Sequence, residues 1–202
     1  MTPAVRKQEP GTGGIAPSGQ GGGPAPVPPF RVMLDGGDMR SIGRVPEVLR
    51  IVRGQPGRMN ELVGCHGSED PVVRGRAADA LEKLTAKRPV LLEPFKGFLL
   101  RVAASSGQQE VRWHLAQMMP RLPLTRREIP SVFSLLRSYL EGRSAIVKVC
   151  ALQAMVELSL RDPSLRPPAK ALAESFCRTG TPAMRARGRK LLSLLKEGKN
   201  GL

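Results

Sequence analysis

Aromatic residues are scarce in this chain. Only 3% of its 202 residues are Phe, Trp or Tyr, whereas hydrophobic residues of all kinds make up 41%. This aliphatic composition favours helices that pack on helices, because a large β-sandwich or barrel uses alternating β-branched and aromatic residues that the sequence does not show. The length suits one domain with its own hydrophobic core.

Cysteines and long apolar runs are also few. The three cysteines, Cys65, Cys150 and Cys177, are odd in number and widely spaced, so they fit neither a disulfide framework nor a CxxC metal pattern. No apolar run approaches the roughly 18 residues that a membrane span requires, and the N-terminus lacks the charged-then-apolar order of a signal peptide. We therefore expect a cytoplasmic protein without membrane insertion, metal or other cofactor.

Acidic residues are outnumbered by basic ones. There are 32 Lys and Arg against 17 Asp and Glu, which gives a net charge of +15. Such an excess attracts polyanions, so nucleic acid, acidic proteins and anionic membrane surfaces are all candidate partners. Codon bias in a high-GC bacterial genome would also enrich arginine, and the charge alone does not identify the partner.

The first 40 residues are dense in glycine and proline. A segment of this composition buries too little apolar surface to offset the entropy lost on ordering. We expect a disordered tail over residues 1–40, a repeat domain over 41–198 and a flexible C-terminus over 199–202. A small apolar cluster within the tail is expected to pack against the first helix of the domain: Phe30, Val32 and Met33.

Four segments of the remaining chain resemble one another. They align without gaps, and a basic residue near the start of each recurs at intervals of 38, 36 and 37 residues. A period near 37 with one amphipathic helix per copy leaves room for a second helix, and apolar stripes at helical spacing lie in the intervals. We predict about nine helices between residues 43 and 197. The recurring cations are Arg74, Arg112, Lys148 and Arg185.

Capping residues and small residues agree with this period. Asp70 and Thr181 each precede a proline at an expected helix start, and Thr125 with Glu128 has the spacing of a capping box. Small residues recur at one position of the expected buried faces, where they let neighbouring helices approach closely. These small residues are Ala77, Ala151 and Gly188.

The pattern D-P-x-V-R-x-x-A-x-x-A-L at residues 70–81 resembles the second helix of a HEAT repeat, in particular the PBS-lyase type. The resemblance covers about three quarters of the chain. It implies an all-α, right-handed α-solenoid of about four to five helix pairs. In HEAT proteins the second helices line a concave face that commonly binds a protein, a peptide or a nucleic acid, and function in this class resides on that surface.

Exposed side chains of the expected second helices are the candidate partner-binding residues. Trp113 fits this role by stacking on a partner, although burial between two repeats explains it equally well. The recurring cations are better explained as structural ties between loops than as a phosphate-tracking stripe. The candidate partner-binding residues are Arg76, Lys83, Trp113, His114, Gln117, Arg121, Gln153, Arg187 and Lys190.

Catalysis finds little support in the sequence, and we assign no catalytic or metal-ligating residue. His66 and His114 fall in different repeats, and the adjacency of Cys65 and His66 does not by itself set the geometry of a nucleophile and its base. HEAT-like DNA glycosylases and bilin lyases share the repeat type, but the glycosylase aspartate and tryptophans cannot be carried over. We expect a non-catalytic scaffold for an acidic protein, with nucleic-acid binding as the alternative and a divergent enzyme as the third.

Overall fold

The computed structural model describes residues 27–197, and in this range it contains helices and turns but no strand. Nine α-helices follow one another between Val45 and Glu197, as the repeat pattern predicts, and a short helix precedes them. The α-helices are α1 (Phe30–Leu34), α2 (Val45–Gly54), α3 (Met59–Gly64), α4 (Pro71–Thr85), α5 (Lys96–Ser105), α6 (Gln109–Met118), α7 (Glu128–Ser138), α8 (Ala145–Arg161), α9 (Arg166–Thr179) and α10 (Pro182–Glu197).

Short 3₁₀ segments join or extend many of these helices. Such segments are common at helix ends and as connectors between helices. The segments are η1 (Pro56–Arg58), η2 (Cys65–Gly67), η3 (Pro89–Phe95), η4 (Met119–Arg121), η5 (Tyr139–Glu141) and η6 (Pro163–Leu165).

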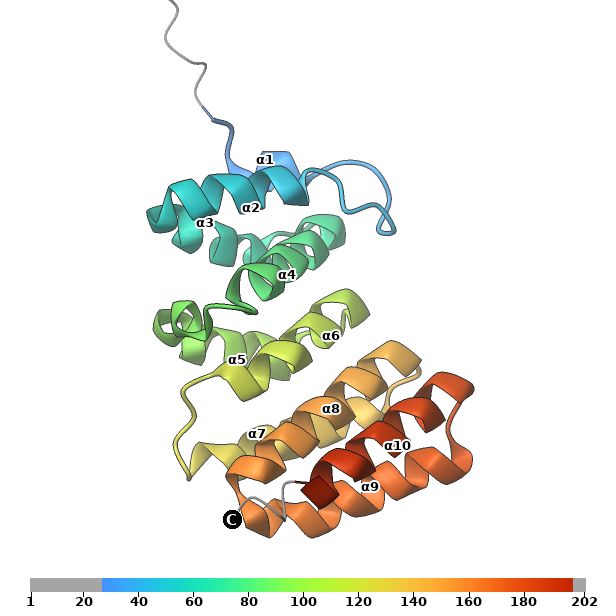
Figure 1. The fold of residues 1–202 in the computed structure, drawn as a ribbon. Helices are drawn as coiled ribbons and strands as arrows, with labels where there is room; N and C mark the ends of the chain where they lie inside the picture. Colours follow the sequence, from blue (N-terminus) through green and yellow to red (C-terminus); the bar gives the residue numbers. More distant parts are fainter. Residues whose placement is uncertain (1–26, 198–202) are drawn as a thin grey trace, which may run out of the picture.

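The even-numbered helices pack on one another in chain order. Helix α2 contacts α4, α4 contacts α6, α6 contacts α8, and α8 contacts α10 (Figure 1). Each odd-numbered helix from α3 onward packs against the even-numbered helix that follows it. Helices α4, α6, α8 and α10 run in the same direction, so their C-terminal ends lie along one edge of the molecule (Figure 1).

The expected caps are present at the helix starts. The Asp70 carboxylate accepts a hydrogen bond from the Val72 amide at 2.7 Å, and Thr181 Oγ1 accepts from the Met184 amide at 3.4 Å. The capping box is reciprocal, because the Thr125 amide donates to Glu128 at 2.7 Å and the Glu128 amide donates to Thr125 Oγ1 at 3.3 Å. These bonds satisfy amides that lack a partner within the helix.

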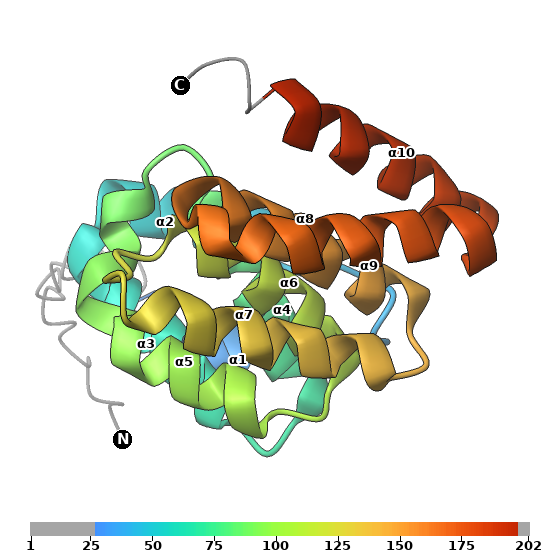
Figure 2. The same cartoon turned by 90° about the horizontal axis from the view of Figure 1, so that it is seen from below.

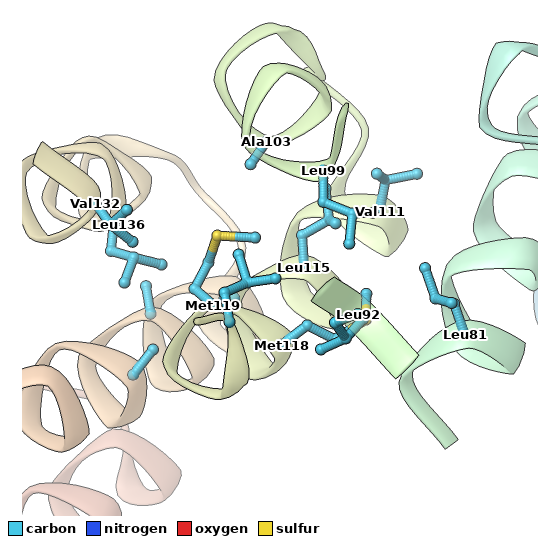
Figure 3. Close-up of a cluster of buried hydrophobic side chains, with 14 of the residues drawn as sticks. Leu81, Leu92, Leu99, Ala103, Val111, Leu115, Met118, Met119, Val132 and Leu136 are labelled. Atoms are coloured by element: carbon cyan, nitrogen blue, oxygen red, sulfur yellow. The ribbon is translucent and has the colours of Figure 1, made fainter. Parts of the chain in front are cut away.

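One continuous hydrophobic core runs from α1 to α10. Figure 3 shows its middle part, where leucine, valine and methionine side chains of successive helices meet. The predicted apolar faces of α4, α6 and α8 are buried, as the fully buried Ala77, Leu115 and Ala151 illustrate. The few aromatic residues include Tyr139, whose hydroxyl donates to the Ala103 carbonyl at 2.7 Å inside this core.

Helix α1 corrects the predicted boundary of the disordered tail. Phe30 and Met33 are buried as the apolar cluster predicts, whereas Val32 is 63% exposed. The Phe30 amide donates to the Glu61 carboxylate at 2.6 Å, and the Arg58 guanidinium lies 4.0 Å from the centre of the Phe30 ring. Ordered structure therefore begins before residue 40. The rest of the predicted tail, residues 1–26, and the C-terminal residues 198–202 lie outside the described residues.

Gly188 brings α10 close to α9. A β-carbon built at Gly188 would lie 2.9 Å from the Ala173 carbonyl oxygen and 2.9 Å from Cys177 Sγ, so no side chain fits there without a shift. The close approach predicted from small residues is thus present, and at Gly188 the neighbouring helix is α9.

Within residues 27–197, no helix combines the length and the apolar character that crossing a membrane would need.

Candidate partner-binding face

Several predicted partner-binding residues meet across the boundary between α4 and α6. Arg121, the last residue of η4, places Nη2 2.6 Å from the Glu82 carboxylate of α4. His114 Nε2 lies 3.8 Å from Asp79 Oδ1, and Asp79 also pairs with Lys83 at 2.7 Å. We call the exposed side of α4, α6, α8 and α10 that carries these contacts the even-helix face.

Gln153 makes the corresponding connection between α8 and α10. Its Oε1 accepts a hydrogen bond from Arg187 Nη1 at 3.0 Å, and its Nε2 donates to Glu157 at 2.5 Å. Lys190, which follows Arg187 by nearly one turn of α10, is exposed. The structure therefore brings the predicted residues together in two groups, one on α4 and α6 and the other on α8 and α10.

Charge is distributed unevenly along the even-helix face. Lys83 and Arg121 each pair with a carboxylate of α4, so the α4–α6 end carries little net charge. Helix α10 carries five Lys or Arg residues and one acidic residue, Glu197. The positive potential of this face is therefore concentrated at its α10 end.

The prediction that the Arg76 side chain is exposed is wrong. Arg76 is only 6% exposed. Its guanidinium donates to five main-chain carbonyls at the end of α1 and in the segment between α1 and α2, among them Leu34 at 2.8 Å, Gly36 at 2.6 Å and Ser41 at 3.0 Å. Helical periodicity alone predicts that residue 76 lies on the solvent side of α4. It does not reveal that the segment between α1 and α2 covers that side.

A pocket of about 550 Å³ opens between this covering segment, α4 and α6. Its apolar lining includes Val72, Trp113 and two exposed side chains, Met39 at 41% and Ile42 at 54% exposure. Trp113 is half-buried, and its ring lies edge-on to His114 with 5.2 Å between the ring centres. Trp113 thus keeps part of its surface accessible within a pocket, which a side chain fully wedged between helices would not.

His114 contributes no positive charge to the face at neutral pH. Burial lowers its pKa from the ordinary 6.5, and this effect outweighs the nearby Asp79 and Glu82 carboxylates, which raise it. Within the described part of the chain, its buried Nδ1 has no hydrogen-bond partner. The neighbouring Gln117, half-buried on α6, donates to the Trp113 carbonyl at 3.4 Å.

Three of the four recurring cations bind the turn that precedes their own helix. Each donates to a carbonyl five or six residues earlier, which ties the turn to the helix. The contacts are Arg74 to Ser68 at 2.7 Å, Arg112 to Ser106 at 2.6 Å and Arg185 to Gly180 at 2.8 Å. Arg74 also reaches the next repeat through Gln108 Oε1 at 3.0 Å. The fourth cation, Lys148, is half-buried.

Cys65, Cys150 and His66 lie in environments that keep them neutral. Burial raises the pKa of the Cys65 and Cys150 thiols to about 11, so neither is a thiolate at neutral pH. His66 packs edge-on against Phe98, and burial lowers its pKa. Among residues 27–197, no group of three or more His, Cys, Asp or Glu side chains could hold a metal ion.

Sequence reasoning missed the acidic residues of this face. Asp79 and Glu82 hold three of the predicted residues, namely Lys83, His114 and Arg121. The signal was present, because Glu82 and Arg121 are separated by about one repeat and Asp79 and Lys83 have the i, i+4 spacing of helical ion pairs. Met39 and Ile42 carried no such signal, since they lie outside the repeats.

These features define an all-helical protein with an exposed face of paired charges, a partly apolar pocket at one end and a basic helix at the other. No family model, curated protein or solved structure matches the chain.

Proposed function

We propose that this chain is a right-handed, HEAT-like α-solenoid that serves as a non-catalytic scaffold and binds a protein partner through the even-helix face. The repeat period and the order in which the even-numbered helices pack support the solenoid assignment. Three free cysteines fit a reducing compartment such as the cytoplasm. Thiols of high pKa and neutral imidazoles support a binding role over a catalytic one.

The pocket around Trp113 carries the proposal. Tryptophan is prominent among the residues that anchor protein interfaces, especially where it lies in a pocket beside other apolar side chains. Here Met39 and Ile42 offer that apolar surface to solvent. Charged side chains also line the pocket, among them Arg40, Asp79 and Glu110, as in the polar rim of an interface.

The charge pattern favours an acidic protein over a nucleic acid. A phosphate backbone that followed the face would meet Lys83 and Arg121 already paired with carboxylates. An acidic patch on a protein need only meet the α10 end, where Arg187 and Lys190 are exposed. The partner thus places an apolar side chain in the pocket and carboxylates against α10.

Capture of partners from a cell extract, with cross-linking to locate the contact, tests both ends of the face. Trp113→Ala should weaken capture because it removes the anchor, and Arg187→Glu with Lys190→Glu should weaken it because the charge is reversed. We expect a loss of about tenfold in each case. Cross-links from the partner should involve Lys83 and Lys190.

Arg101→Glu with Arg137→Glu is the matched control. It changes net charge by the same amount on exposed residues of α5 and α7, away from the even-helix face. This variant should capture the partner like the unmodified protein. Equal losses in the control and the α10 variant, or cross-links confined to odd-numbered helices, would refute binding at the even-helix face.

A further inference from the structure

Helices α9 and α10 meet at one end and separate toward the other (Figure 2). Close contact at Gly188 marks the part where they touch. A groove of about 920 Å³ opens between the beginning of α9 and the end of α10. Its lining includes Pro167, Lys170, Glu174, Leu192, Leu195 and Lys196.

This groove lies where the succession of helices ends. Helices α4, α6 and α8 each pack between two even-numbered neighbours, whereas the described helices that pack on α10 are α8 and α9. Leu192 remains half-buried at the groove, since no further helix follows in the described chain to cover it. A helix of another molecule can therefore pack here by the same ridge-and-groove fit that joins the chain's own helices.

The charges around the groove indicate the chemistry of that helix. Arg166, Lys170 and Lys196 surround its apolar floor, and Glu174, the acidic member of the lining, lies 3.6 Å from Lys170, so the cations of the lining outnumber its one carboxylate. A second copy of this chain is disfavoured as the occupant, because each copy carries a net charge of +15. Complementarity calls for carboxylates beside an apolar stripe.

We propose that the groove between α9 and α10 binds an acidic amphipathic helix of a protein. The inference deepens the proposed scaffold function, on which it rests, by naming a second contact and its chemistry. The apolar stripe of the bound helix covers Leu192 and Leu195, and its acidic flanks pair with Lys170 and Lys196. This contact is separate from the even-helix face with Arg187 and Lys190.

Fluorescence anisotropy of a labelled synthetic peptide, titrated with the full chain, tests the proposal. The probe is a peptide of about four helical turns with a leucine stripe at i, i+3, i+4 and i+7 spacing and glutamates elsewhere. We expect Lys170→Glu with Lys196→Glu to weaken its binding about tenfold. Arg101→Glu with Arg137→Glu, which reverses the same number of charges elsewhere, should leave binding unchanged.

Two further peptides separate shape from charge. A scrambled peptide of the same composition has the charge without the stripe, and a version with lysine in place of glutamate has the stripe without the charge. Both should bind at least about tenfold more weakly than the acidic amphipathic peptide. Equal binding of the scrambled peptide, or equal losses in the groove variant and its control, would overturn the proposal.

Two more variants locate the bound peptide. Arg187→Glu with Lys190→Glu should retain peptide binding. Suppose instead that this variant loses peptide binding while Lys170→Glu with Lys196→Glu keeps it. The peptide then binds outside the groove and the groove assignment fails, although the proposed scaffold function stands. Deleting residues 198–202 should leave the affinity unchanged. A large gain in affinity on deletion would assign the groove to the chain's own C-terminus and would also overturn the proposal.

Discussion

Arg76 shows how a single side chain can determine what the surface of α4 offers to a partner. Its guanidinium is buried and donates to the carbonyls of Leu34, Gly36 and Ser41. Charge-assisted hydrogen bonds of this kind are stronger than those between neutral groups. Arg76 thereby holds in place the segment that carries Met39 and Ile42, and so shapes the pocket that it helps to line.

Arg76→Ala should lower the free energy of unfolding by about 2–3 kcal/mol, because several charge-assisted bonds are lost together. Urea denaturation measures this change, and hydrogen exchange should show faster exchange at residues 34–41. Lys83→Ala, which removes an exposed ion pair with Asp79, should cost less than about 1 kcal/mol. Equal effects of the two substitutions would contradict the role assigned to Arg76.

The sequence predicted which side chains gather on the even-helix face better than it predicted how buried they are and which partners they have. Helical spacing correctly brought Arg121 and Gln153 to the surface of neighbouring helices, where cross-helix partners hold them. It could not show that Arg76 is covered, because the covering segment lies outside the repeats. The i, i+4 spacing of Asp79 and Lys83 did indicate one ion pair of the face, whereas the repeat spacing of Glu82 and Arg121 left open whether they pair, because that depends on how the helices are stacked.

At the scale of helices, the junction of α9 and α10 depends on a residue without a side chain. Glycine is unfavourable in the interior of a helix relative to alanine, yet Gly188 lies in the middle of α10. A β-carbon there would lie 2.9 Å from both Ala173 O and Cys177 Sγ, closer than atoms pack without a shift. Close contact therefore outweighs helix propensity at this position.

Gly188→Ala should destabilise the protein by about 1–3 kcal/mol, since α10 must move away from α9. Gly97→Ala is the control, because a β-carbon at Gly97 in α5 would lie 3.6 Å from the Arg101 side chain. This second substitution should leave stability unchanged or raise it by up to about 1 kcal/mol. Thermal or urea unfolding measures the sign of the change in stability for each substitution. Stabilisation by both would show that the atoms around Gly188 move easily to make room for a β-carbon.

Most helices could be predicted from the sequence, while the starting point of the ordered chain could not. Caps at Asp70, Thr125 and Thr181 are local signals, so they appear where the sequence places them. Helix α1 escaped prediction because its five residues follow a proline-rich stretch and gain their order from distant partners, Arg58 and Glu61. Local patterns do not reveal contacts of that range.

For the whole molecule, the main question is what its net charge of +15 does. Several arginine side chains bind groups of the chain itself: Arg74, Arg112 and Arg185 donate to turn carbonyls, and Arg121 pairs with a carboxylate. These arginines remain charged, but their geometry is fixed by the fold and not by a ligand. The excess charge can therefore attract a polyanion over a distance without forming a continuous track for it.

Binding to duplex and single-stranded DNA and RNA over a salt series distinguishes long-range attraction from a built nucleic-acid site. We expect binding at about 50 mM salt that weakens steeply and falls into the range of non-specific binding, with Kd above about 1 μM, near 150 mM. Arg187→Glu with Lys190→Glu and Arg101→Glu with Arg137→Glu should reduce the low-salt binding equally, because each pair lowers net charge by the same amount. Tight binding at 150 mM salt that only the α10 variant abolishes would instead make nucleic acid the partner of the even-helix face.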